Sequence, residues 1–179
     1  ASVAADATPA QAAARRVDFA AMSAAERAAV RAQADEALRA GRPGQALALY
    51  QQLAAVEGQE IVDDRVGVAE ALAALRLSDQ ALAEFGAISV TWPDFPLAYI
   101  RQGALLEEQG ATEAALTAYR AAVSRAPQSA DAHLVLAYAL ARAGRGPEAL
   151  AAFEDALALD PTRSEEQPAL QALIDASPP

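Results

Sequence analysis

Few residues in this sequence could act as catalysts or metal ligands. His133 is the only histidine among 179 residues, and the chain has neither cysteine nor lysine. Disulfides, thiolate chemistry, cysteine-ligated zinc and Schiff-base catalysis are therefore excluded. A catalytic role for His133 would need partners drawn from serines or carboxylates alone.

Three acidic pairs remain as candidates for metal binding or acid–base catalysis: Asp63-Asp64, Glu107-Glu108 and Glu165-Glu166. Neighbouring residues on a helix point in different directions, so the two carboxylates of a pair cannot meet at one atom. We interpret all three pairs as solvated helix faces. Because no nucleophile, base and orienting group can be assembled, we predict no catalytic residues, no metal site, no cofactor and no enzymatic activity.

Composition favours a helical protein that binds neither nucleic acid nor an anionic membrane. The chain has 24 acidic and 14 basic residues, a formal charge of -10, and phosphate binding needs a basic face. Apolar residues make up 54% of the sequence, and many are alanine, the best helix former. The charge-free run Leu134 to Ala141 is far shorter than the roughly 20 residues that a membrane span requires.

A period of 34 residues runs through the second half of the sequence. It is marked by three prolines, each preceded by an alanine twelve residues earlier and by an aromatic residue eight residues earlier. The prolines are Pro93, Pro127 and Pro161; the alanines are Ala81, Ala115 and Ala149; the aromatic residues are Phe85, Tyr119 and Phe153. An earlier copy, Ala46 with Tyr50, lies one residue out of register. This period is typical of a helix-turn-helix repeat.

The pattern resembles the tetratricopeptide repeat (TPR) family over about residues 27–161. Gly103 and Gly110 match the family's small first-helix residue and its turn glycine. The resemblance implies an all-α fold, a right-handed α-solenoid of about four TPR helix-turn-helix repeats with a C-terminal capping helix. The first-helix tryptophan of the family is replaced by Arg65, Tyr99 and His133, so we expect a structural role for His133.

The 34-residue period and the residues that cap helices or form turns predict four helix pairs and one terminal helix. A capping box at Ser23 and Glu26 starts the first helix, Ser129 and Ser164 start later ones, and Pro147 fits a first turn. The predicted helices are 24–40, 45–56, 61–75, 79–91, 96–109, 112–125, 130–143, 147–159 and 165–176. We divide the chain into an N-terminal tail or extra helix (1–22), a repeat array (23–161) and a C-terminal capping helix with tail (162–179).

In a solenoid of helix pairs, the first helices line the inner side, which is the usual binding surface. Spacings of three and four residues place one stripe of each first helix on that side. The predicted peptide-binding groove comprises Arg31, Asp35, Asp63, Val66, Glu70, Ile100, Ala104, Glu107, Leu134, Tyr138 and Arg142. Its apolar centre and acidic border suit a client peptide that has apolar anchors and some positive charge.

These observations predict a non-catalytic scaffold or chaperone-like adaptor. Family members that clamp a C-terminal carboxylate use lysine and asparagine, and this sequence contains neither, so that subclass is excluded. Two alternatives stay open: the apolar stripe only packs between repeats, or the protein is an assembly module. Self-association would then use the end helices or the N-terminal segment around Arg15-Arg16.

The remaining expectations concern location and one aromatic segment. The Ala-, Ser- and Thr-rich start favours an exported, periplasmic protein of the bacterial cell envelope, with the cytoplasm as alternative. The segment Trp92 to Pro96 is interpreted as a stiff turn whose aromatic rings plug the core, or else as an exposed anchor.

Overall fold

The computed structural model describes residues 19, 21–56 and 61–177 of the chain. Within them lie nine α-helices, one 3-10 helix and no strand. The α-helices are α2 (Ala24–Arg39), α3 (Pro43–Ala54), α4 (Val62–Ala74), α5 (Ser78–Thr91), α6 (Pro96–Glu108), α7 (Thr112–Arg125), α8 (Ala130–Arg142), α9 (Gly146–Leu159) and α10 (Gln167–Ala176). All nine predicted helices are confirmed, each end within two residues. The predicted N-terminal tail lies almost entirely outside the described residues.

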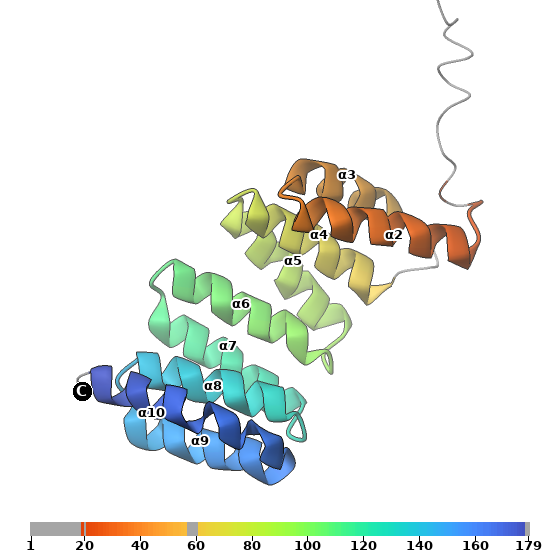
Figure 1. Cartoon of the computed structure of the whole chain (residues 1–179). Helices are drawn as coiled ribbons and strands as arrows, with labels where there is room; N and C mark the ends of the chain where they lie inside the picture. The colour runs from red at the N-terminus through yellow and green to blue at the C-terminus, as the bar shows by residue number, and fades with distance from the viewer. Residues whose placement is uncertain (1–18, 20, 57–60, 178–179) are drawn as a thin grey trace, which may run out of the picture.

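The helices form an all-α solenoid of four helical hairpins. Each helix from α2 to α9 packs against the next one along the chain, so the pairs α2–α3, α4–α5, α6–α7 and α8–α9 stack in order (Figure 1). The first helices α2, α4, α6 and α8 also contact one another across the hairpins at the α2–α4 and α6–α8 steps. We call the side formed by these four helices the inner face.

The repeated residues build the core that holds the hairpins together. The alanines Ala46, Ala81, Ala115 and Ala149 are at most 1% exposed, and the aromatic residues Tyr50, Phe85, Tyr119 and Phe153 at most 3%. Small alanines let paired helices approach closely, and the rings fill the space beside them. The roles that the period predicts for these two positions are confirmed.

The second helices end before the three periodic prolines, at the residues where the predicted ranges end. α5, α7 and α9 end at Thr91, Arg125 and Leu159, two residues before Pro93, Pro127 and Pro161. That preceding residue, such as Trp92 with φ −125° and ψ 75°, has left the helical region. The proline ring disfavours helical geometry in the residue before it, so the last helical residue lies two positions before each proline.

Two packed clusters divide the core. The first runs from α2 to α6 and the second from α7 to α10. Helix α6 serves both, because Ala98 and Leu105 belong to the first cluster whereas Ile100 packs against the second. Trp92 and Phe95 also pack against the first cluster, which confirms the interpretation of their segment as a core-plugging turn.

The start of the C-terminal helix differs from the prediction. Pro161–Glu166 form a 3-10 helix, η1, and α10 begins only at Gln167. The cap of η1 is Asp160, whose side chain accepts a hydrogen bond of 3.1 Å from the backbone N–H of Thr162. Ser164 therefore caps nothing and lies inside η1, so its predicted capping role is wrong. The predicted caps at Ser23 and Ser129 are confirmed.

Helix α10 covers the last hairpin by packing along α8. Leu170 is completely buried there, and Leu173 and Ile174 pack against the second cluster. Among the residues described, none of the helices combines the length and the apolarity that crossing a bilayer would take.

Candidate functional site

Arginine–carboxylate pairs connect each helix of the inner face to its neighbour. Between α2 and α4, Arg31 donates to both oxygens of Asp64 at 2.6 and 3.0 Å. Between α4 and α6, Arg101 lies 3.0 Å from Glu70. Between α6 and α8, Arg142 donates to both oxygens of Glu107 at 3.0 and 2.8 Å, and the further pair Arg163–Asp131 continues the series to η1. Much of the charge predicted to border the groove is thus compensated within the chain.

A first hollow of about 300 Å³ opens between α2, α4 and α6. Its charged lining consists of Arg31, Asp35, Asp63 and Glu70, which is three carboxylates and one guanidinium. Arg31 is already paired with Asp64, and Glu70 with Arg101. Asp35 accepts a hydrogen bond from the neutral hydroxyl of Tyr50, and Asp63 is exposed on the helix surface. Besides the hydrogen bond to Asp64, the charges of Asp63 and Asp35 raise the pKa of Arg31, so this guanidinium offsets them in part, and the hollow keeps a net negative charge.

A second hollow of about 260 Å³ lies beside the first, between α4, α5 and α6. Its floor is apolar and is made of Phe85 and Leu105 from the core together with Ala73 and Ala104. Its rim carries Glu70, Arg101 and Glu108. Glu70 lines both hollows, so they are neighbours on the inner face of the first three repeats, and we call the pair the depression.

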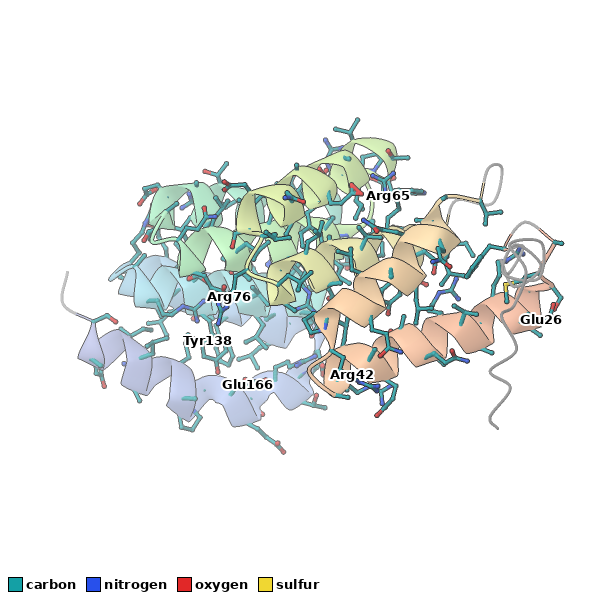
Figure 2. The ribbon with its side chains drawn as sticks, turned by 90° about the horizontal axis from the view of Figure 1, so that it is seen from above. Glu26, Arg42, Arg65, Arg76, Tyr138 and Glu166 are labelled. Carbon is teal, nitrogen blue, oxygen red and sulfur yellow. The ribbon has the colours of Figure 1, made fainter. Side chains whose placement is uncertain are left out.

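The fourth repeat presents a different surface, because the chain's own residues occupy its inner side. The Tyr138 hydroxyl donates to Glu166 of η1 at 3.0 Å, and Arg142 is held by Glu107. Figure 2 shows Tyr138 on the side of α8 that faces Glu166 and the C-terminal helix. Burial and then the hydrogen bond to Glu166 raise the pKa of Tyr138, so its hydroxyl remains a donor across the physiological range.

The predicted groove residues therefore separate into groups. Arg31, Asp35, Asp63, Val66 and Glu70 meet around the first hollow, and Ala104 joins Glu70 in the second. Glu107, Tyr138 and Arg142 take part in contacts between helices. Ile100 packs against the second cluster. Val66 and Leu134 are only 7% and 6% exposed, so these two apolar residues offer little surface to a partner.

Sequence reasoning missed several residues that line the hollows. Arg101, Phe85, Leu105 and Tyr50 do not lie on the inner stripe of a first helix. They border a hollow because the hollows form between helices rather than along one. For two of them the sequence holds a signal, because Arg101 and Leu105 lie within one helical turn of the predicted groove residue Ala104, whereas Phe85 and Tyr50 lie on second helices.

Two tyrosines fix carboxylates near the inner face. Tyr119 donates to Glu107 at 2.7 Å, and Tyr50 donates to Asp35. Burial, followed by the hydrogen bond to the neighbouring carboxylate, raises the pKa of both hydroxyls well above the ordinary tyrosine value. These hydroxyls are permanent donors, so they orient the carboxylates without cancelling their charge.

The interpretation of the acidic pairs as solvated faces is wrong for Asp64. Its side chain is 1% exposed and receives the two hydrogen bonds from Arg31. Asp63, its neighbour, is exposed and lines the first hollow, so the two side chains lie on different sides of α4, as expected for adjacent helix positions. Across residues 19, 21–56 and 61–177, no group of three or more histidine, aspartate or glutamate side chains could hold a metal ion.

His133 lies in a structural position. It is 9% exposed, its Nε2 donates to the carbonyl oxygen of Pro127 at 3.1 Å, and its Nδ1 is 3.6 Å from an oxygen of Asp155. Its hydrogen bond thereby ties the start of α8 to the preceding turn, at the place where the family has its packing tryptophan.

Comparison with known proteins identifies the repeat. The family model for the tetratricopeptide repeat matches residues 68–130 and 100–164, which together span more than half of the 179 residues. A search of curated proteins finds no match.

Solved structures show the same fold at low sequence identity. MamA from Desulfovibrio magneticus RS-1 is 22% identical with a TM-score of 0.59, covering 90% of this chain and 94% of that one. YrrB, described as a TPR protein with an unusual peptide-binding site, is 18% identical with a TM-score of 0.61, covering 86% and 76%. PcrH, solved in complex with the chaperone binding region of PopB, is 17% identical with a TM-score of 0.59, covering 66% and 95%. On the family match and the shared solenoid, this chain belongs to the tetratricopeptide repeat family.

Proposed function

We propose that this protein is a non-catalytic interaction module that binds an extended segment of a client protein along the inner face of its first three repeats. The observation that carries the proposal is the depression, the pair of neighbouring hollows that share Glu70. Small-molecule pockets have volumes of about 300–1,000 Å³. The first hollow is at the lower limit of that range and the second is below it, so each suits one side chain of a peptide.

The proposal is supported by the kind of surface and by the fold. The second hollow has an apolar floor and a charged rim, which is the arrangement that anchors a side chain and keeps its surroundings polar. Proteins of the same fold include YrrB, with its peptide-binding site, and PcrH, with its bound region of PopB. Proteins of this repeat family typically act as interaction modules rather than as catalysts.

The experiment that tests this function fills the second hollow. Ala104 lies on its floor, and Ala104→Phe would occupy the space that a client side chain needs. The matched control is Ala83→Phe on α5, which adds the same ring at an exposed position outside both hollows. We expect Ala104→Phe, but not Ala83→Phe, to abolish capture of the proteins that the wild type enriches from native extract.

The interpretation of that experiment depends on folding, which circular dichroism and thermal melting of both variants will check. If folded Ala104→Phe captures the same proteins as the wild type, the inner face of the first three repeats is not the binding surface. A substitution at Leu134 would be a poorer choice, because this residue is buried and its loss would disturb the core.

We also propose a location in the bacterial cell envelope, as expected from the sequence. Fractionation of the native host with an antibody to this chain tests it directly. Recovery of the protein in the cytoplasmic fraction would refute the location and leave the binding function standing.

A further inference from the structure

We infer that the client segment carries an arginine or lysine next to a large apolar residue, the cation entering the first hollow and the apolar side chain the second. This inference rests on the proposed function and adds the chemical class of the partner. It commits to an extended basic–apolar peptide as the occupant of the depression.

Charge complementarity selects the cation for the first hollow. Its lining adds three carboxylates to one guanidinium, a formal charge of −2. The guanidinium of Arg31 is turned to Asp64, a carboxylate that is itself 1% exposed and outside the lining. The two remaining charges, on Asp35 and Asp63, come from neighbouring helices and converge on one hollow, where an incoming ammonium or guanidinium can pair with both.

The second hollow selects an apolar residue. Phe85 and Leu105 border the hollow but are only 1% and 6% exposed, so the apolar surface open to a partner comes chiefly from the half-buried Ala73 and Ala104. The acid Glu70 on its rim is neutralised by Arg101 at 3.0 Å, so no uncompensated charge faces the floor from this side. A large apolar side chain placed here removes its own surface from water, together with the exposed parts of Ala73 and Ala104.

The two hollows also imply that the protein recognises a short client segment through two of its side chains. The hollows share Glu70, so their occupants lie next to one another along the peptide. Beyond them, towards the fourth repeat, the contacts Glu107–Arg142 and Tyr138–Glu166 tie up the polar groups of the inner face. The recognition surface is thus confined to the first three repeats.

The test uses the full chain and defined probes. A panel of fluorescein-labelled twelve-residue Gly/Ser peptides carries one arginine and one leucine, separated by none to four residues, in both orders. Matched peptides replace the arginine by glutamate or the leucine by serine. Fluorescence anisotropy at low and at high salt measures affinity for the wild type, Asp63→Asn, Ala104→Phe and the control Glu154→Gln, which removes one exposed charge on α9.

We expect at least one Arg/Leu peptide to bind, and its affinity to fall with salt. Replacing its arginine by glutamate should weaken binding about tenfold or more, and Asp63→Asn roughly fivefold, the size of a partly exposed charge pair. Ala104→Phe should abolish binding, and Glu154→Gln should leave it unchanged. Circular dichroism of each variant confirms that the fold is retained.

Other outcomes would overturn the inference in distinguishable ways. Equal binding of the leucine peptides with and without arginine would refute the cation preference but leave the binding function intact. Binding of none of the panel would refute the basic–apolar class, and the capture experiment with Ala104→Phe would then decide the function by itself. Self-association of the chain that is abolished by Ala104→Phe would identify a second copy, rather than a separate client, as the occupant.

Discussion

One turn of the solenoid holds a residue in a backbone conformation that its side chain disfavours. Gly41, Gly110 and Gly144 close their hairpins with φ of 68°, 74° and 71°, and at the matching place in the second repeat stands Arg76 with φ of 63°. The turn is a Schellman motif, in which the N–H of Leu77 bonds to the carbonyl of Leu72 and the N–H of Arg76 to that of Ala73. Only glycine adopts this conformation without steric cost.

Arg76→Gly is therefore expected to stabilise the protein. A non-glycine residue in the left-handed region costs about 1–2 kcal/mol, which the glycine variant no longer loses. Glycine also gives the unfolded chain more conformational entropy, which lowers the stability of the variant by about 0.4–1 kcal/mol. The side chain gives up little, because its guanidinium is 3.8 Å from Glu108 and both groups are largely exposed. The net gain in the free energy of unfolding therefore lies between about 0 and 1.6 kcal/mol and is centred near about 0.8 kcal/mol, or about 2–3 °C in Tm for a chain of this size.

Urea denaturation measures this gain, followed by circular dichroism and by the fluorescence of Trp92, the only tryptophan, which packs in the first cluster. Arg76→Ala is the control that removes the guanidinium but keeps the strain. Gly110→Ala is the reciprocal change, and since no atom lies within 4 Å of the added Cβ, only backbone strain should destabilise it, by about 1 kcal/mol. A variant Arg76→Gly that is no more stable than Arg76→Ala would refute the reasoning.

Three further predictions concern the packed interior. Gly103→Ala should destabilise the protein by about 1–3 kcal/mol in urea melts, since the added Cβ would lie 2.5 Å from the ring of Tyr119. Gly86→Ala is the control and should be neutral or stabilising, because only the tip of the flexible Gln102 side chain lies nearby, at 3.5 Å. Because the pKa of Tyr119 is raised in the folded state, its contribution is complete below about pH 10 and is lost at higher pH. Melts across pH 8 to 11.5 should show this loss, and Tyr119→Phe should reduce it; an unchanged slope would contradict it. Asp64→Asn should destabilise by about 2–3 kcal/mol, below the full cost of a broken buried pair because Arg31 retains 24% exposure, and a loss under 0.5 kcal/mol would show that the pair is dispensable.

The sequence by itself determined the helices, their order and the residues that pack between them. Proline, glycine and the cap residues act through local backbone sterics and local hydrogen bonds, so their effect can be predicted without knowing the rest of the fold. The alanine and aromatic positions repeat every 34 residues because each hairpin must present the same surface to the next one. This regularity makes the period visible in one sequence and gives helix ends within two residues of those observed.

Tertiary structure alone decided the form of the candidate site. The inner stripe of each first helix could be predicted, but which of its members pair, become buried or line a hollow depends on the offset between neighbouring hairpins. Asp64 was expected in solvent and is buried because Arg31, 33 residues earlier, reaches across to it. Phe85 borders the second hollow although it lies on a second helix, because α5 closes the space between α4 and α6.

The same physical difference explains the C-terminal end. The sequence indicated a terminal helix from its apolar spacing, yet the 3-10 segment before it arises from Pro161 and the Asp160 cap acting together with the contacts of Arg163 to Asp131 and Glu166. Local chemistry fixes where a helix can exist, whereas the distances between side chains on separate helices are fixed by packing of the whole solenoid. The depression that we propose as the binding surface depends on these distances between helices, so it could not be predicted from local chemistry.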